Sequence, residues 1–165
     1  MRIGKKASIR DVLIVVVVFF VVMMGFFLMN FTTKTITTAM KNNTQIASVP
    51  EAVTSLDSTS NMVDRLDYLG FGLLIGLLLA MMIAGYFVGG NRIFMFVYFI
   101  IIILAVIVSA VLSNVWGDVT GLSTIFGTTI SAFPLSNHII GNFPIYTAIA
   151  GFIGIISMFA KPTTE

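Results

Sequence analysis

The sequence predicts an all-α, polytopic integral membrane protein with four transmembrane helices. Three apolar runs without a single charged residue support this prediction, and they cover residues 12–29, 68–91 and 93–114. A helix needs roughly 20 apolar residues to cross a hydrocarbon core about 30 Å thick, and such a run must be helical because no water satisfies its backbone there. Charged residues make up only 10% of the chain, against roughly 25% in soluble domains. This composition excludes a single water-soluble core.

The distribution of charge favours a fourth span over residues 144–160, a shorter run that is rich in small residues. Six of the basic residues flank one side of the predicted spans: Arg2, Lys5, Lys6, Arg10, Arg92 and Lys161. The other three, Lys34, Lys41 and Arg65, fall on the opposite side with five acidic residues: Glu51, Asp57, Asp64, Asp67 and Asp118. Basic segments stay in the cytoplasm. Four spans therefore place both termini on the cytoplasmic side.

These assignments divide the chain into eight predicted segments. They are a basic cytoplasmic tail (1–11), transmembrane helix 1 (12–29), an external polar helical lobe (30–67), transmembrane helix 2 (68–91), transmembrane helix 3 (93–114), an external loop with an amphipathic interfacial helix (115–143), transmembrane helix 4 (144–160) and a cytoplasmic tail (161–165). The first span is longer than a secretory signal peptide requires, and we expect it to be retained as an anchor.

The external lobe is predicted to contain helices that continue the neighbouring spans. Helix 1 should run past the membrane and end near Asn42 and Asn43. Residues 48–51, Ser-Val-Pro-Glu, have the form of a capping box, so a second helix should begin there. Asp64 and Asp67 then fall on the solvated end of the helix that leads into the second span.

The external loop carries one apolar stripe at helical spacing, formed by Val119, Leu122, Phe126, Ile130 and Phe133. This pattern predicts one helix over residues 119–133, which lies in the membrane interface or re-enters the bilayer; we favour the interface. Pro134 and Pro144 bracket a segment that we expect to be a turn-rich connector. Trp116 and Tyr146 have positions typical of interfacial aromatic residues.

Small residues predict how the helices pack. Gly72, Gly76, Ala80 and Ala84 recur every four positions in the second span, and Ala105, Ser109 and Ser113 do so in the third. Such faces let helix backbones approach closely in lipid. We expect these two faces to meet, with Gly151 and Gly154 supplying a further small surface in the fourth span. Leu74 lies beside the predicted face and should tolerate alanine.

The chain offers few residues for chemistry. It has no cysteine and only one histidine, His138, so neither a thiolate nor a histidine-based metal site can form within one chain. The spans contain no ionisable residue on which a coupled transporter could rely. The basic amino-terminal tail lacks the interleaved aromatic residues of a nucleic-acid site. We therefore expect no catalytic, cofactor-binding or metal-binding residue, no enzyme activity and no nucleic-acid partner.

Two functional classes remain. The first is a structural or assembly subunit, whose partners are the lipid bilayer and other membrane or capsid-type proteins, in an oligomer or hetero-complex. In size and span density the chain resembles small multi-pass membrane proteins from the virions of membrane-containing bacteriophages, and accessory subunits of large membrane complexes. The second class is a holin-like, lesion-forming or channel protein, which is also small and multi-spanning.

The charge asymmetry makes a prediction about topology that single cysteines can test, because the natural chain contains none. In intact cells, an impermeant thiol reagent should label a cysteine at Asn43 and should not label one at Lys5 or Thr163. Labelling at Thr163 without labelling at Lys5 would mean that the chain crosses the membrane three times.

Overall fold

The computed structural model describes residues 9–88 and 92–159, and all of the regular structure in these ranges is helical. The helices are α1 (Ile9–Lys41), α2 (Thr44–Ala47), α3 (Pro50–Asp64), α4 (Leu66–Val88), α5 (Arg92–Gly121), α6 (Ser123–Ala132), α7 (Pro134–Gly141) and α8 (Phe143–Phe159). The prediction of an all-α protein is confirmed. The predicted tail 161–165 and most of the tail 1–11 lie outside the described residues.

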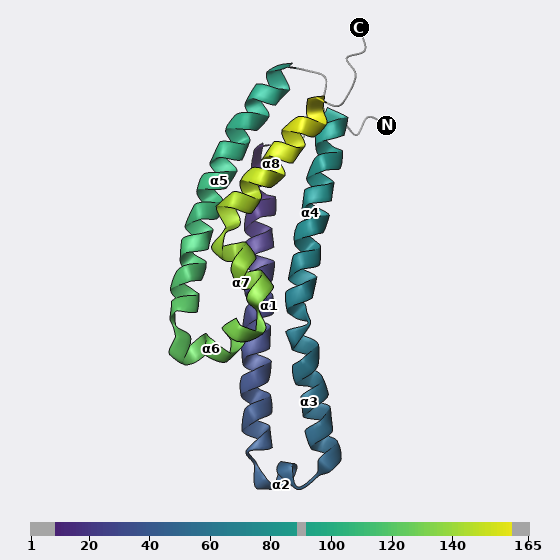
Figure 1. Cartoon of the computed structure of the whole chain (residues 1–165), viewed down its shortest axis with the longest axis vertical. Helices are drawn as coiled ribbons and strands as arrows, with labels where there is room; N and C mark the ends of the chain where they lie inside the picture. The colour runs from purple at the N-terminus through teal and green to yellow at the C-terminus, as the bar shows by residue number, and fades with distance from the viewer. Residues whose placement is uncertain (1–8, 89–91, 160–165) are drawn as a thin grey trace.

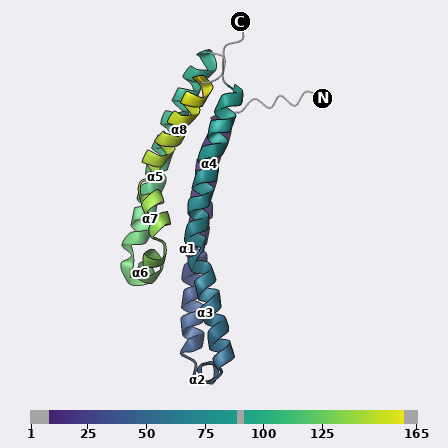
Figure 2. The ribbon, with the colours of Figure 1, turned by 45° about the vertical axis from the view of Figure 1, so that its right-hand side comes forward.

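The helices form four elongated columns that run alternately in opposite directions (Figure 1). The columns are α1, α3 continued by α4, α5, and α7 continued by α8. Helix α8 packs against both α4 and α5 and lies between them, whereas α1 packs mainly against α3 and α5. Figure 2 shows α1, α3 and α4 on one side of the molecule and α5 to α8 on the other.

Two of these helices are long and apolar enough to cross a membrane, over residues Val12–Lys41 and Phe96–Gly121. A third candidate is the pair α7 and α8, which meet at a bend of 73° and reach the required length only when taken together. The chain is therefore a helical membrane protein with two or three candidate spans among the described residues.

The polar lobe is a helical hairpin that projects beyond α6 (Figure 1). Helix α1 continues to Lys41 and α3 begins at Pro50, as predicted. The predicted capping box is wrong: Val49 is the residue that precedes α3, and the Ser48 hydroxyl donates to the Gln45 carbonyl. Ion pairs of Lys34 with Asp64 and of Lys41 with Asp57 join the two arms of the hairpin.

Residues 119–133 do not form the single amphipathic helix that their spacing predicts. Helix α5 continues to Gly121, the backbone leaves helical geometry at Leu122 (φ −77°, ψ 57°), and α6 begins at Ser123. This break allows α6 to turn against α1, where the Phe126 and Phe133 rings contact the Phe27 ring at centroid distances of 5.4 and 6.1 Å. Packing of these rings against α1 therefore stabilises the broken arrangement more than one continuous amphipathic helix would.

The turn-rich connector expected after Pro134 is also wrong, because this segment is the helix α7. Pro134 occupies the first turn of α7, where a missing backbone N–H costs nothing. The segment is internal: Ser136, Ile139 and Ile140 are buried. Pro134 therefore marks the first turn of a helix and not a turn between helices.

The predicted contact between the second and third spans is wrong over the described residues, because α8 lies between α4 and α5 (Figure 1). Gly72 and Gly76 are exposed and face open space. The side chains of Ala80 and Ala84 lie outside the described set. The inner face of α4 instead contains Asp67, Gly70 and Leu74, at a spacing of i, i+3 and i+7. Leu74 is only 3% exposed, so the structure favours a destabilising effect of alanine at this position over the predicted tolerance.

The small residues of α8 do pack against α5. A Cβ atom on Gly151 would lie 2.5 Å from Ile102 Cγ2, and one on Gly154 would overlap the Tyr98 hydroxyl oxygen. Both approaches are far closer than van der Waals contact. On the α5 side Ala105 and Ser109 are buried, and the Ser113 hydroxyl donates to the Gly141 carbonyl over 2.8 Å.

Adding one methyl group should therefore distinguish the inner glycines from the outer ones. We expect Gly151→Ala to lower the free energy of unfolding in detergent by about 1–3 kcal/mol, because Ile102 and α5 must move to admit the methyl group. Gly76→Ala is the matched control and should cost nothing within one chain. Equal losses in the two variants would contradict the packing of α8 on α5.

Candidate functional site: a buried polar layer

Polar side chains join the four columns near the end of the bundle that meets the lobe, and most of them are buried. We call this set the polar layer; it comprises Asn30 on α1, Asp64 on α3, Asp67 on α4, Trp116 on α5, and Ser136 and Asn137 on α7. Its members bond in pairs between helices: Asn30 with Asp64, Asp67 with Ser136, and Trp116 with Asn137. The layer is thus a set of ties between segments far apart in sequence.

Asp67 makes the most extensive contact in the layer. Its carboxylate is 2% exposed and accepts hydrogen bonds from the Leu135 amide at 3.1 Å, the Ser136 amide at 2.7 Å and the Ser136 hydroxyl at 2.6 Å. The first amides of a helix have no partner within that helix. Asp67 therefore caps the amino terminus of α7 from another helix.

The sequence of α7 creates the need for this external cap. Phe133 precedes the helix and has no side chain that could accept the free amides. A carboxylate meets that need well, because its hydrogen bonds are charge-assisted and the helix dipole favours negative charge at this end. The placement of Asp67 on a solvated helix end is therefore wrong.

Gly70 allows the close approach on which this cap depends. It is buried one turn after Asp67, and a Cβ atom there would lie 2.7 Å from Met23 Sδ and 3.3 Å from Ser136 Oγ. A larger residue at this position would have to displace the end of the Met23 side chain and would crowd the Ser136 hydroxyl. In the sequence, this contact is indicated by Asp67 and Gly70, which lie three positions apart. The pattern of small residues at every fourth position does not include this pair.

A second tie connects α1 to α3. Asn30 is fully buried, and its Nδ2 donates to Asp64 Oδ1 over 2.8 Å. The same carboxylate oxygen lies 2.7 Å from Lys34 Nζ, one turn further along α1. The lysine thus balances the charge of Asp64 at the base of the lobe.

A third tie connects α5 to α7. The Trp116 indole Nε1 donates to Asn137 Oδ1 over 2.9 Å, and its ring meets the Phe27 ring edge-on at a centroid distance of 4.9 Å. Trp116 is 1% exposed, so its indole packs inside the bundle, and its position at the membrane interface stays a prediction. Tyr146 is half-buried, and its ring lies 6.2 Å from the ring of the exposed His138.

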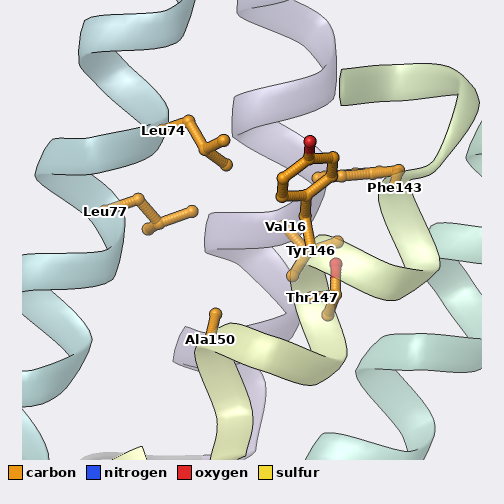
Figure 3. Close-up of a pocket in the computed structure, with 7 residues that line it drawn as sticks. All are labelled: Val16, Leu74, Leu77, Phe143, Tyr146, Thr147 and Ala150. Atoms are coloured by element: carbon orange, nitrogen blue, oxygen red, sulfur yellow. The ribbon is translucent and has the colours of Figure 1, made fainter. Parts of the chain in front are cut away.

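The interior next to the polar layer is closely packed. Figure 3 shows Leu74 and Leu77 of α4 pointing toward Tyr146 of α8, with Val16 of α1 nearby. The cavity between them has a volume of about 10 Å³, which is close to the least that holds one water molecule. Substrate has no room at this point of the interior.

The polar layer is arranged for joining helices. The Ser136 hydroxyl donates to Asp67 and is fully buried, so a substrate cannot reach it as a nucleophile. His138, the only histidine in the chain, is exposed and does not belong to the Ser136 and Asp67 pair. Within residues 9–88 and 92–159, no three acidic or histidine side chains lie close enough to hold a metal ion.

Removing the cap should loosen α7 specifically. We expect Asp67→Ala to lower the free energy of unfolding by about 3 kcal/mol, because it leaves one buried amide, one partly buried amide and a buried hydroxyl without their acceptor. Ser136→Ala removes only the hydroxyl bond and should cost about 1 kcal/mol.

Amide hydrogen exchange gives the local readout for this prediction. In Asp67→Ala the amides of Leu135 and Ser136 should lose protection, while those in the middle of α1 keep theirs. Unchanged protection at Leu135 and Ser136 would show that α7 does not depend on the cap.

Comparison with known proteins gives no relative for this chain, since no family model, curated protein or solved structure matches it.

Proposed function

We propose that the protein is a non-enzymatic structural or assembly subunit of a larger membrane assembly, such as the membrane of a bacteriophage virion. One observation carries the proposal: the polar side chains of the bundle interior are used to join helices, and the Asp67 cap is the clearest case. A protein built in this way is a rigid scaffold, whose outer surface is available to partners.

The proposal includes four membrane crossings with both termini on the cytoplasmic side. The fourth crossing consists of α7 and α8 together, and α4 supplies the second. Support for the broken span comes from its internal bonds: the Asn142 amide donates to the His138 carbonyl, and the Ser113 hydroxyl donates to the Gly141 carbonyl. Irregular backbone at membrane depth is tolerated where protein buries and satisfies it.

The lobe supplies the surface that we assign to protein partners outside the membrane. It projects beyond the bundle (Figure 1), and its apolar residues Ile36, Met40, Val49 and Met62 are exposed. Lys34 and Lys41 are paired within the lobe with Asp64 and Asp57. Recognition would therefore depend on shape and apolar contact more than on these charges.

A holin-like, lesion-forming function is the second candidate, because α6 exposes the hydroxyls of Thr124 and Thr128. Two neighbouring hydroxyls are already bonded within the chain: Thr120 donates to the Trp116 carbonyl and Ser131 to the Thr128 carbonyl. The remaining weakly polar surface is small, and we rank this candidate second.

Expression of the chain alone in bacterial cells separates the two candidates. A structural subunit should leave the membrane potential intact, as measured with a potential-sensitive dye, because its interior contacts offer no lining for a water-filled path. A collapse of the potential that Thr124→Leu with Thr128→Leu abolishes would contradict the structural proposal. Gly127, between them on α6, provides a control position: Gly127→Leu should not abolish such a collapse.

A direct test of assembly uses the chain in its natural host. After extraction in mild detergent, we expect the chain to migrate in a complex several times larger than its own 17.9 kDa, with defined partner proteins. Substitution of Ile36 and Met62 by serine should release the partners and leave the helical content unchanged. Recovery of the chain alone under these conditions would overturn the proposal.

A further inference from the structure

Among the described side chains, two buried polar atoms remain without a hydrogen-bond partner after the ties above are formed: Asn30 Oδ1 and Thr129 Oγ1. Both side chains are 0% exposed. A buried polar group without a partner is rare in folded proteins, and each case calls for a physical explanation.

The orientation of the Asn30 amide is fixed by its other half. Nδ2 donates to Asp64 Oδ1 at 2.8 Å, and an ionised carboxylate can only accept hydrogen bonds. Rotating the amide by half a turn would bring two acceptor oxygens together. The Oδ1 atom therefore points away from Asp64 and requires a donor.

Thr129 departs from the usual behaviour of threonine in this chain. The hydroxyls of Thr35, Thr54, Thr59 and Thr120 each donate to the carbonyl four residues earlier in the same helix. Thr129 makes no such bond, although it lies within α6. Its hydroxyl is thus free to donate and to accept.

Aromatic contacts show that the segments that carry the two groups pack against each other. Phe27 and Phe31 lie on either side of Asn30 along α1, and Phe126 and Phe133 lie on either side of Thr129 along α6. The Phe126 ring contacts both Phe27 and Phe31, and the Phe133 ring contacts Phe27. These rings shield the interface from the surroundings.

We propose that α1 and α6 enclose a binding site for one water molecule, which bridges Asn30 Oδ1 and Thr129 Oγ1. Water donates to the amide oxygen and exchanges a hydrogen bond with the hydroxyl, so both unpaired atoms are satisfied. A cation fits less well, because the nearest carboxylate, Asp64, is already balanced by Lys34 at 2.7 Å. The water extends the tie from Asp64 through Asn30 to α6.

A structure of the full chain at a resolution that shows ordered water tests the proposal directly. We expect one isolated density peak within about 2.7–3.2 Å of both oxygen atoms. A direct hydrogen bond between the two side chains, or separate protein partners for each, would overturn the proposal. A peak with the shorter distances of a metal ion would overturn it as well.

Substitutions at Thr129 give a second, independent measurement. Thr129→Val keeps the shape and removes the hydroxyl, so we expect Tm in detergent to fall by about 3 °C relative to the natural chain. Thr128→Val changes an exposed hydroxyl on the same helix and should leave Tm unchanged. An unchanged or higher Tm for Thr129→Val would overturn the proposal, because replacing a hydroxyl that has no partner costs nothing.

Discussion

The carboxylate of Asp67 is the contact on which the arrangement of the helices depends. It joins the start of α4 to the start of α7, residues 67 and 135–136, through three hydrogen bonds in a buried position. Without this acceptor, the amino terminus of α7 would leave buried amides unsatisfied, which is costly where water is absent. The cap therefore explains how a short helix can lie inside the bundle and lead into α8.

The other contacts follow from this placement. With α7 held against α4, Asn137 accepts a hydrogen bond from Trp116, and the Gly141 carbonyl accepts one from the Ser113 hydroxyl. Helix α8 then lies between α4 and α5. Gly151 and Gly154 then allow α8 to approach α5 closely. Interior hydrogen bonds and small residues thus take the place of the hydrophobic force, which is weak between helices in lipid. A scaffold of this kind suits a subunit that presents its outer surface and its lobe to other proteins.

Hydrophobic patterning predicted the helical class, the long first helix and the position of the hairpin well, because these depend on local composition. It failed where a distant residue decided the outcome. Asp67 was predicted to lie on a solvated helix end, because the amides that it accepts belong to α7, far along the chain. Pro134 was predicted to lie in a turn, because the residue that caps its helix is on α4. The repeat of Gly72 and Gly76 suggested a packing face, yet the buried face is set by Asp67, Gly70 and Leu74. Spacing within one helix does not show which partner lies opposite.

The most direct test of this account is a disulfide crosslink between α4 and α7 in the native membrane. The natural chain lacks cysteine, and a Cβ atom at Gly70 would lie 3.3 Å from Ser136 Oγ, so side chains at these two positions are close neighbours, as a disulfide requires. We predict that Gly70→Cys with Ser136→Cys forms an intramolecular crosslink on mild oxidation, identified by mass spectrometry of the joined peptides. The control pair Gly72→Cys with Ser136→Cys should not crosslink, because Gly72 faces open space. Crosslinking of the control pair, or of neither pair, would contradict the docking of α7 on α4.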